Sequence, residues 1–164
     1  MGTYLISVVD AGDPVAVRDV RRLFEQYHAW LGETVSSTHL AQEIDTLPRP
    51  YVEPDGRLLL ARTEAGEAVG TVGIRPHDRQ ACEIKRLFVR EDARGAGLGR
   101  SLVRYALESC RELGYAEARM TTLPGVMDGA LRMYRSFGFE ECEPFRDFSH
   151  VHDGVAIMFL RRGV

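Results

Sequence analysis

The segment with the clearest chemical signature is Arg94-Gly95-Ala96-Gly97-Leu98-Gly99, where three glycines fall within five residues, between a strand-like run and a helix-like run. Glycine has no Cβ atom, so such a segment can turn tightly and let a ligand approach its backbone N–H groups. At a helix start those N–H groups lack internal partners, and with the helix dipole they favour an anion. An arginine guanidinium is also suited to phosphate oxygens. The segment therefore predicts a phosphate site.

Two familiar phosphate motifs do not fit this spacing. A dinucleotide-binding turn requires Gly-x-Gly-x-x-Gly, and Gly99 comes one residue too early. A P-loop requires Gly-Lys-Ser/Thr, whereas Gly99 is followed by Arg100 and Ser101. A helix start that needs glycines only for close packing is the structural alternative.

The elements around this segment follow from hydrophobic periodicity. Helices are predicted at 14–33, with Asp13 as N-cap, and at 38–47, 98–113 and 128–137. Strands are predicted at 3–9, 57–63, 67–75, 82–90, 115–122, 139–142 and 155–160. The strand, helix and strand around the glycines form a βαβ unit with parallel strands, whereas the flanking hairpins require antiparallel pairing. A mixed α/β sheet with helices on its faces is expected.

Three motifs in this order resemble the GNAT superfamily of acyl-CoA-dependent N-acetyltransferases. Residues 94–99 are similar to its Arg/Gln-x-x-Gly-x-Gly/Ala signature, and Glu-Ile-Lys-Arg-Leu-Phe-Val at 83–89 is similar to its fourth strand. Residues 134–139 are similar to its helix ending in Tyr-x-x-x-Gly-Phe. The resemblance implies one GNAT-like domain over residues 1–164. Its sheet would be mixed and mostly antiparallel with about seven strands, helices on both faces and a central βαβ unit.

The resemblance also implies acetyl-CoA (coenzyme A) as co-substrate. The glycine amides would hold the pyrophosphate, and the pantetheine arm would pair with the fourth strand where it diverges from the fifth, satisfying exposed backbone groups. The implied coenzyme-binding residues are Leu87, Phe88, Val89, Arg94, Gly95, Ala96, Gly97, Leu98, Gly99 and Arg100. Many family members place an asparagine before the next helix, but this chain has none and carries Met127-Asp128 there. Asp128 is predicted to cap that helix.

Two catalytic residues are implied in the same way. Tyr134 matches the family tyrosine that protonates the coenzyme sulfur, and Glu83 stands where several members place a general base. Desolvation in a buried strand would raise the pKa of Glu83 and suit it to that role. The alternatives are a core aromatic at Tyr134, a Glu83–Lys85 ion pair, and ordered water as the base. The N–H of Leu87 or Phe88 is the expected oxyanion donor.

Family acceptors enter opposite the coenzyme, between the first two helices and the last hairpin. The candidate residues there are Tyr27, His28, Trp30, His39, Tyr51, Phe145, Asp147, Phe148, His150 and His152. Aromatic residues beside carboxylates suit a cationic amine, although the helical spacing of Tyr27 favours a place in the core. His150 and His152 could share one strand face, but no carboxylate or thiol motif stands at ligand spacing, so no metal is expected.

Composition limits the function classes. The chain has 164 residues, a net charge of −3 and 24 acidic residues interleaved with its basic ones, which disfavours nucleic acid as a partner. No apolar run approaches the roughly 18 residues of a membrane helix. The three cysteines, Cys82, Cys110 and Cys142, are expected to be free thiols, and a cytoplasmic monomer or homodimer is expected. All basic residues except Lys85 are arginine, which a GC-rich coding sequence would explain.

The leading hypothesis is therefore an N-acetyltransferase that uses acetyl-CoA. It would acetylate a primary amine, either on a small molecule or at a protein N-terminus, by direct attack in a ternary complex, because no nucleophilic Cys or Ser motif is present. A non-catalytic acyl-CoA-binding sensor or interaction module is the alternative, and the presence of both Glu83 and Tyr134 weighs against it. No motif identifies the acceptor.

Overall fold

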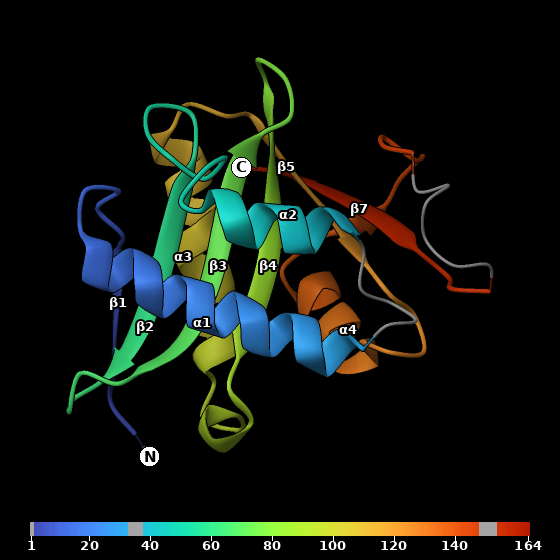
Figure 1. Cartoon of the computed structure of the whole chain (residues 1–164). Coiled ribbons are helices and arrows are strands. Elements are labelled where there is room, and N and C mark those ends of the chain that lie inside the picture. Colours follow the sequence, from blue (N-terminus) through green and yellow to red (C-terminus); the bar gives the residue numbers. More distant parts are fainter. Residues whose placement is uncertain (1, 33–37, 148–153) are drawn as a thin grey trace.

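The computed structural model describes residues 2–32, 38–147 and 154–164, and its elements follow one another in the predicted order (Figure 1). They are β1 (Tyr4–Val8), α1 (Pro14–Leu31), α2 (Thr38–Thr46), β2 (Arg57–Thr63), β3 (Ala68–Pro76), β4 (Ala81–Val89), the 3-10 turn η1 (Glu91–Ala93), α3 (Leu98–Glu112), β5 (Glu117–Thr122), α4 (Asp128–Ser136), β6 (Glu140–Glu141) and β7 (Met158–Gly163).

The strands form one seven-stranded sheet in the order β1-β2-β3-β4-β5-β7-β6. Only β4 and β5 pair in parallel, and each of the other neighbouring pairs is antiparallel. This confirms the predicted fold class, a mixed and mostly antiparallel sheet with a central βαβ unit. No helix in the described ranges is both long enough and apolar enough to cross a bilayer.

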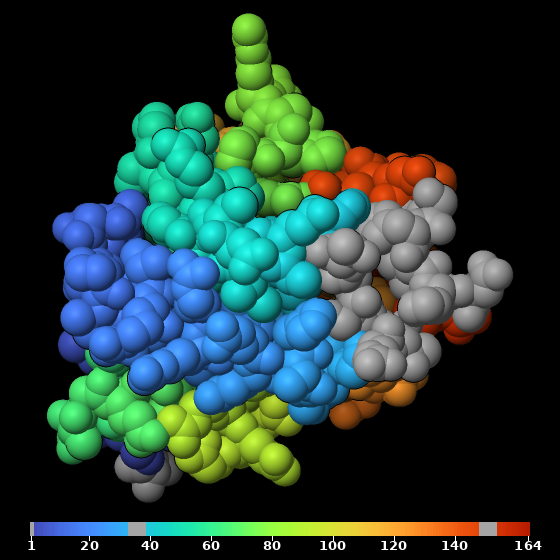
Figure 2. Space-filling model, in the orientation of Figure 1, coloured from blue at the N-terminus to red at the C-terminus, as the bar shows by residue number. Residues whose placement is uncertain are grey.

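Two apolar clusters bury the two faces of the sheet. On one face α1 and α2 cover β2, β3 and β4 (Figure 1). The two helices lie side by side in the space-filling view (Figure 2). On the other face α3 and α4 contribute the helical side of the second cluster. The run Leu58-Leu59-Leu60-Ala61 serves both faces, because alternate residues of a strand point to opposite sides. A continuous apolar run is typical of a strand that is covered twice.

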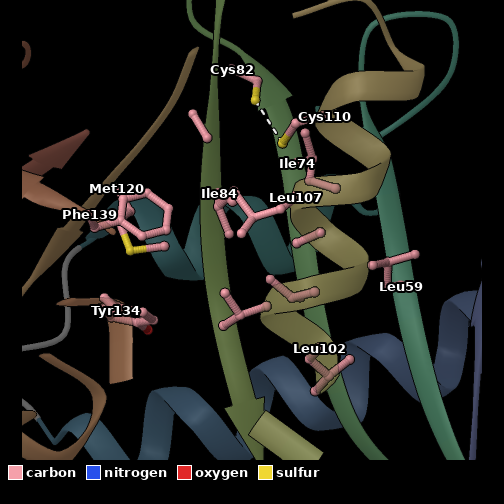
Figure 3. Packing of buried hydrophobic residues seen from close by; sticks show 14 of the residues in the cluster. Leu59, Ile74, Cys82, Ile84, Leu102, Leu107, Cys110, Met120, Tyr134 and Phe139 are labelled. Atoms are coloured by element: carbon pink, nitrogen blue, oxygen red, sulfur yellow. Dashed lines mark hydrogen bonds between the residues drawn. The ribbon is translucent and has the colours of Figure 1, made fainter. Parts of the chain in front are cut away.

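The helix termini show how the sequence sets the boundaries. Asp13 caps α1 as predicted, since its Oδ1 accepts hydrogen bonds from the N–H groups of Val15 and Ala16 at 2.9 and 3.2 Å. The helix α3 buries Leu102, Ala106 and Cys110 against the sheet, and Figure 3 shows Leu102 and Cys110 on the side of α3 that faces the strands. The Sγ atoms of Cys82 and Cys110 lie 2.9 Å apart there as free thiols.

Two local predictions are wrong. The last strand was expected at 155–160, but β7 spans Met158–Gly163, because its pairing with β5 runs from Met158 opposite Thr122 to Gly163 opposite Glu117. The strand thus continues through two arginines that lie outside the apolar run. Asp128 does not cap α4: it is the first helical residue, and its Oδ1 accepts from the N–H of Gly125 at 2.7 Å.

The packing of Tyr51 on Gly73 generates a stability prediction. A Cβ at Gly73 would lie 2.6 Å from Cδ1 of the Tyr51 ring, which is buried, so Gly73→Ala should overpack the core. We expect it to lower the free energy of unfolding by about 1–3 kcal/mol in urea titrations.

Gly163→Ala is the matched control. It is also a strand glycine, but a Cβ there would meet only the Ala116 carbonyl oxygen, at 3.9 Å. This variant should stay within about 0.5 kcal/mol of the unmodified protein. Equal losses in the two variants would contradict the packing argument.

Candidate active site

The site is built on an irregularity in the middle of β4. The register with β3 shifts between Thr71 and Gly73, so that Arg86 and Leu87 lie together opposite Val72. Arg86 has a φ of +60°, which lies in the left-handed region that residues other than glycine rarely adopt. Its guanidinium makes two hydrogen bonds to Glu43 of α2, at 2.9 and 3.1 Å, which hold the residue in place. We call this feature the bulge.

Beyond the first residues of β4, its other edge is open. The parallel pairing with β5 joins Ala81, Cys82 and Glu83 to residues 117–119, and in the described part of the chain no later β4 residue pairs with β5. A cleft of about 590 Å³ fills the space between the diverging strands. The bulge, the glycine segment, β5, α4 and the end of α1 all contribute to its walls.

The glycine segment closes one end of the cleft. Gly95 and Gly97 have φ values of +85° and +80°, and Gly97 is the N-cap of α3 without any side-chain cap. From Gly95 to Arg100, no backbone N–H has a hydrogen-bond acceptor within the described ranges. Free amides at a helix start are the arrangement that the glycine spacing predicts for an anion site.

The two arginines of this segment already have protein partners. Arg94 donates from Nε to the Val89 carbonyl at 2.9 Å, and its guanidinium lies 5.5 Å from the centre of the Trp30 ring. Arg100 donates from Nη1 to Oγ of Ser136 at 2.9 Å, which ties α3 to α4. Both arginines also line the cleft.

Tyr134, on α4, lines the cleft. Its ring is buried against Phe139, with the ring centres 6.2 Å apart, and it lies near Met120 and Phe139 in Figure 3. Burial raises the pKa of Tyr134 well above its usual range, so the hydroxyl is protonated at neutral pH. Tyr134 thus belongs to the core, which was the structural alternative, and it also lines the cleft.

Glu83 does not line the cleft, and it is completely buried. Its Oε2 accepts hydrogen bonds from Arg75, at 3.2 Å, and from Arg146, while Oε1 lies 3.7 Å from Nζ of Lys85. In the described part of the chain Oε1 has no hydrogen-bond partner.

The expected pKa of Glu83 is wrong in direction. Burial does raise the pKa, but the charges of Lys85, Arg75 and Arg146 outweigh it and hold the pKa below its ordinary value. The ion pair with Lys85, which was the alternative interpretation, is present.

Lys85 stands between Glu83 and the cleft, which it lines. Burial lowers its pKa to about 7; Arg86 and Arg75 lower it, while Glu83 and Glu43 raise it.

Sequence reasoning missed most of this group of charges. Glu43, Arg75, Glu83, Lys85, Arg86 and Arg146 form what we call the charged cluster. Arg75 lies directly opposite Glu83 in the β3–β4 hairpin, so a correct hairpin register would have found that pair. Glu43 and Arg146 come from distant segments, and nothing in the local sequence signals their approach.

The predicted coenzyme residues are brought together, with one exception. Of that set, Ala96 alone does not line the cleft. On the acceptor side, Tyr51 is buried and donates to Oε2 of Glu43 at 2.8 Å, and Tyr27 packs in the core while also bordering the cleft. Trp30 and Asp147 are exposed. Phe148, His150 and His152 lie outside the described residues.

Comparison with known proteins places the chain among acetyltransferases. Residues 18–139 match the family described as Acetyltransferase (GNAT) family. An uncharacterized N-acetyltransferase of Schizosaccharomyces pombe is 34% identical over 141 residues, which cover 85% of this chain and 86% of that protein.

Solved structures show the same fold. An acetyltransferase from Streptococcus agalactiae aligns with a TM-score of 0.76 at 15% identity and covers 98% of both chains. A GNAT family acetyltransferase from Elizabethkingia anophelis, with acetyl-CoA bound, aligns with a TM-score of 0.68 at 20% identity, also over 98% of both chains. At these identities the two structures establish the fold.

The charged cluster generates a pH prediction for stability. Burial raises the pKa of Glu43, but hydrogen bonds from Arg86 and Tyr51 and the charges of Arg86 and Lys85 lower it to about 2. A lowered carboxyl pKa stabilises the fold above the unfolded value of 4.5, and this contribution is lost as the pH falls toward 2. Between pH 5 and pH 2 the unmodified protein should therefore lose about 2–3 kcal/mol more than Glu43→Gln in urea titrations.

Glu64→Gln, in the exposed β2–β3 turn, serves as the control and should follow the unmodified protein at every pH. If Glu43→Gln shows the same acid loss as the unmodified protein, the lowered pKa of Glu43 is refuted.

Proposed function

Because the chain belongs to the acetyltransferase (GNAT) family, we propose that it transfers an acetyl group from acetyl-CoA to a primary amine by direct attack in a ternary complex. The observation that carries this proposal is the cleft, which joins free amides of the glycine segment, an open edge of β4 and Tyr134. The acceptor is a small-molecule amine or a protein N-terminal amine.

The coenzyme would lie along the cleft in one orientation. Its pyrophosphate would bind the amides from Gly95 to Arg100, which offer several donors and the positive end of α3. The amide groups of pantetheine would then pair with the β4 edge from Leu87 to Val89, which β5 leaves open. In this orientation the thioester reaches the bulge. Acetyl-CoA bound to the Elizabethkingia anophelis protein supports this choice of co-substrate.

Direct attack requires an uncharged amine and a stabilised intermediate. The amine nitrogen would bond to the thioester carbon, and the carbonyl oxygen would become an oxyanion held by the N–H of Leu87 or Phe88. The bulge takes Leu87 out of the regular pairing with β3, which suits its backbone to this role. No cysteine or serine of the described segments lines the cleft, in keeping with a reaction that has no acyl-enzyme.

Collapse of the intermediate breaks the C–S bond and leaves a thiolate. The Tyr134 hydroxyl would give its proton to the sulfur and take back the second proton from the new amide nitrogen. Because burial disfavours the tyrosinate, this exchange leaves Tyr134 protonated for the next cycle. The first proton, which the acceptor ammonium loses before attack, would leave toward the Glu83–Lys85 pair.

The coenzyme site can be tested at Gly97. An alanine there must adopt a φ of +80°, so Gly97→Ala should distort the amides and weaken coenzyme A binding about tenfold or more in calorimetric titrations, since a 1–2 kcal/mol strain is of that size. Gly114→Ala, at the other end of α3 with a φ of +89°, imposes the same strain. It should reduce stability but not coenzyme affinity. Equal affinity loss in both variants would count against the glycine segment as the phosphate site.

The reaction itself is tested by thiol release from acetyl-CoA with a panel of amines: spermidine, free amino acids, kanamycin and a peptide with a free N-terminus. We expect release with at least one of them, and Tyr134→Phe should lower kcat about 10²- to 10⁴-fold with unchanged coenzyme affinity. Tight coenzyme binding without release from any amine would favour a non-catalytic sensor. Unchanged kcat in Tyr134→Phe would remove Tyr134 from the mechanism.

A further inference from the structure

Lys85 is the only lysine in a chain that uses arginine at every other basic position. A GC-rich coding sequence explains the preference for arginine, but it does not explain why the one exception lines the cleft. Arginine remains protonated in proteins, whereas a buried lysine loses its proton readily. A lone lysine at this place therefore indicates a need for a cation that can become neutral.

The position of Lys85 is close to the reaction proposed above. It directly precedes the bulge, two residues before Leu87, whose backbone we assigned to the oxyanion. Lys85 lines the same cleft as Tyr134, and its side chain is 11% exposed. An amine that attacks a thioester at the bulge would thus come within reach of Nζ.

The charges that act on Lys85 come from β4 and from two other segments: Arg86 and Glu83 lie on β4 itself, Arg75 lies on β3 and Glu43 lies on α2. Arg146, which precedes β7, pairs with Glu83. The arginines and the low exposure favour the neutral amine, and the two glutamates favour the ammonium. Their balance lowers the pKa of Lys85 to about 7, so that neutral and charged forms coexist at physiological pH.

We propose that neutral Lys85 is the general base that takes the proton from the acceptor ammonium, and that Glu83 is a positioning residue that holds Lys85. This inference rests on the proposed acetyl transfer and deepens it. It replaces Glu83 with Lys85 as the group that meets the amine.

The proton balance is simple. One N–H bond of the acceptor ammonium breaks, and its proton forms a bond to the lone pair of Nζ, leaving a neutral amine and a Lys85 ammonium. The amine then attacks the thioester, and its second proton goes through Tyr134 to the coenzyme sulfur. Lys85 returns its proton to water through the cleft, so one proton is released for each acetyl group transferred.

Glu83 is poorly placed to do this work itself. It does not line the cleft, its Oε2 is bound by two arginines, and its pKa lies below the ordinary value. Its Oε1, which has no hydrogen-bond partner among the described residues, lies 3.7 Å from Nζ of Lys85. There it can attract and orient the lysine, and it becomes the nearest counter-ion once Lys85 is charged.

A spectroscopic experiment tests the base without using activity. Protein labelled with 13C-lysine gives one lysine signal, because Lys85 is the only lysine in the chain. We expect the Cε shift to titrate with a midpoint near neutrality in the coenzyme A complex. A midpoint near the ordinary lysine value of 10.5 would overturn the proposal.

A kinetic experiment separates base, charge and scaffold roles, with the fastest amine of the panel. Lys85→Arg keeps the charge but cannot accept a proton, so kcat/KM at pH 7 should fall about 10²- to 10⁴-fold. The deficit should shrink as the pH approaches about 10, where free amines lose their own proton. Lys85→Met should behave likewise. Arg111→Met, at the exposed end of α3, is the control and should leave the pH profile unchanged.

Glu83→Gln distinguishes the two candidates for the base. If Lys85 is the base, loss of the carboxylate lowers the lysine pKa, and the rising limb of kcat/KM moves to lower pH but persists. Disappearance of that limb would make Glu83 the base and overturn the proposal. Coenzyme A affinity, measured for every variant, identifies any that has lost its fold.

Three further results would decide the matter. Full activity in Lys85→Arg would show that only the charge matters, and an acetyl group on Lys85 that forms and decays at the turnover rate would show an acyl carrier. Either result overturns the base while acetyl transfer stands. Absence of thiol release from the unmodified protein would instead contradict the proposed function.

Discussion

The site depends on the way β4 leaves the regular sheet. The backbone N–H and C=O groups of a strand in the middle of a sheet normally all form hydrogen bonds to its two neighbouring strands. Here β5 departs after Glu83, and the bulge then shifts the pairing with β3. Free backbone groups in the interior are costly, so such an edge is stable only when water or a ligand can reach it. The open cleft follows from that requirement.

Ion pairs and hydrogen bonds stabilise the irregular part of β4. Arg86 adopts an unfavourable φ at the bulge, and Glu43 holds it with two hydrogen bonds from α2. The same carboxylate accepts from Tyr51 and lies 3.7 Å from Arg75. A half-buried network of this kind rigidifies a site only when its members are well paired. Two atoms of the charged cluster, Glu83 Oε1 and Arg146 Nε, have no hydrogen-bond partner among the described residues. Oε1 lies 3.7 Å from Nζ of Lys85, and Lys85 lines the cleft.

Local signals in the sequence were enough to find the frame of the site. The glycine segment, the apolar face of α3 and the helix that carries Tyr134 each depend on residues close together in the chain, and each lies where it was expected. Glu83 shows where that reasoning ends. Its burial was foreseeable from the strand, but the direction of its pKa depends on the combined charges of Lys85, Arg75 and Arg146, and only tertiary folding brings Arg146 to it. The predicted bounds of β7 were wrong for a similar reason, because pairing with β5 determines where β7 begins and ends.

The contact of Tyr51 with Gly73 shows that residues outside the cleft help to determine the shape of the site. Gly73 gives the Tyr51 ring its place, the Tyr51 hydroxyl orients Glu43, and Glu43 fixes Arg86 at the bulge. None of the first three residues lines the cleft. Tolerance to substitution will therefore not decline evenly with distance from the reacting groups. In a search for variants that use new acceptors, substitutions at Gly73, Tyr51 or Glu43 offer a way to reshape the bulge without changing any residue that lines the cleft.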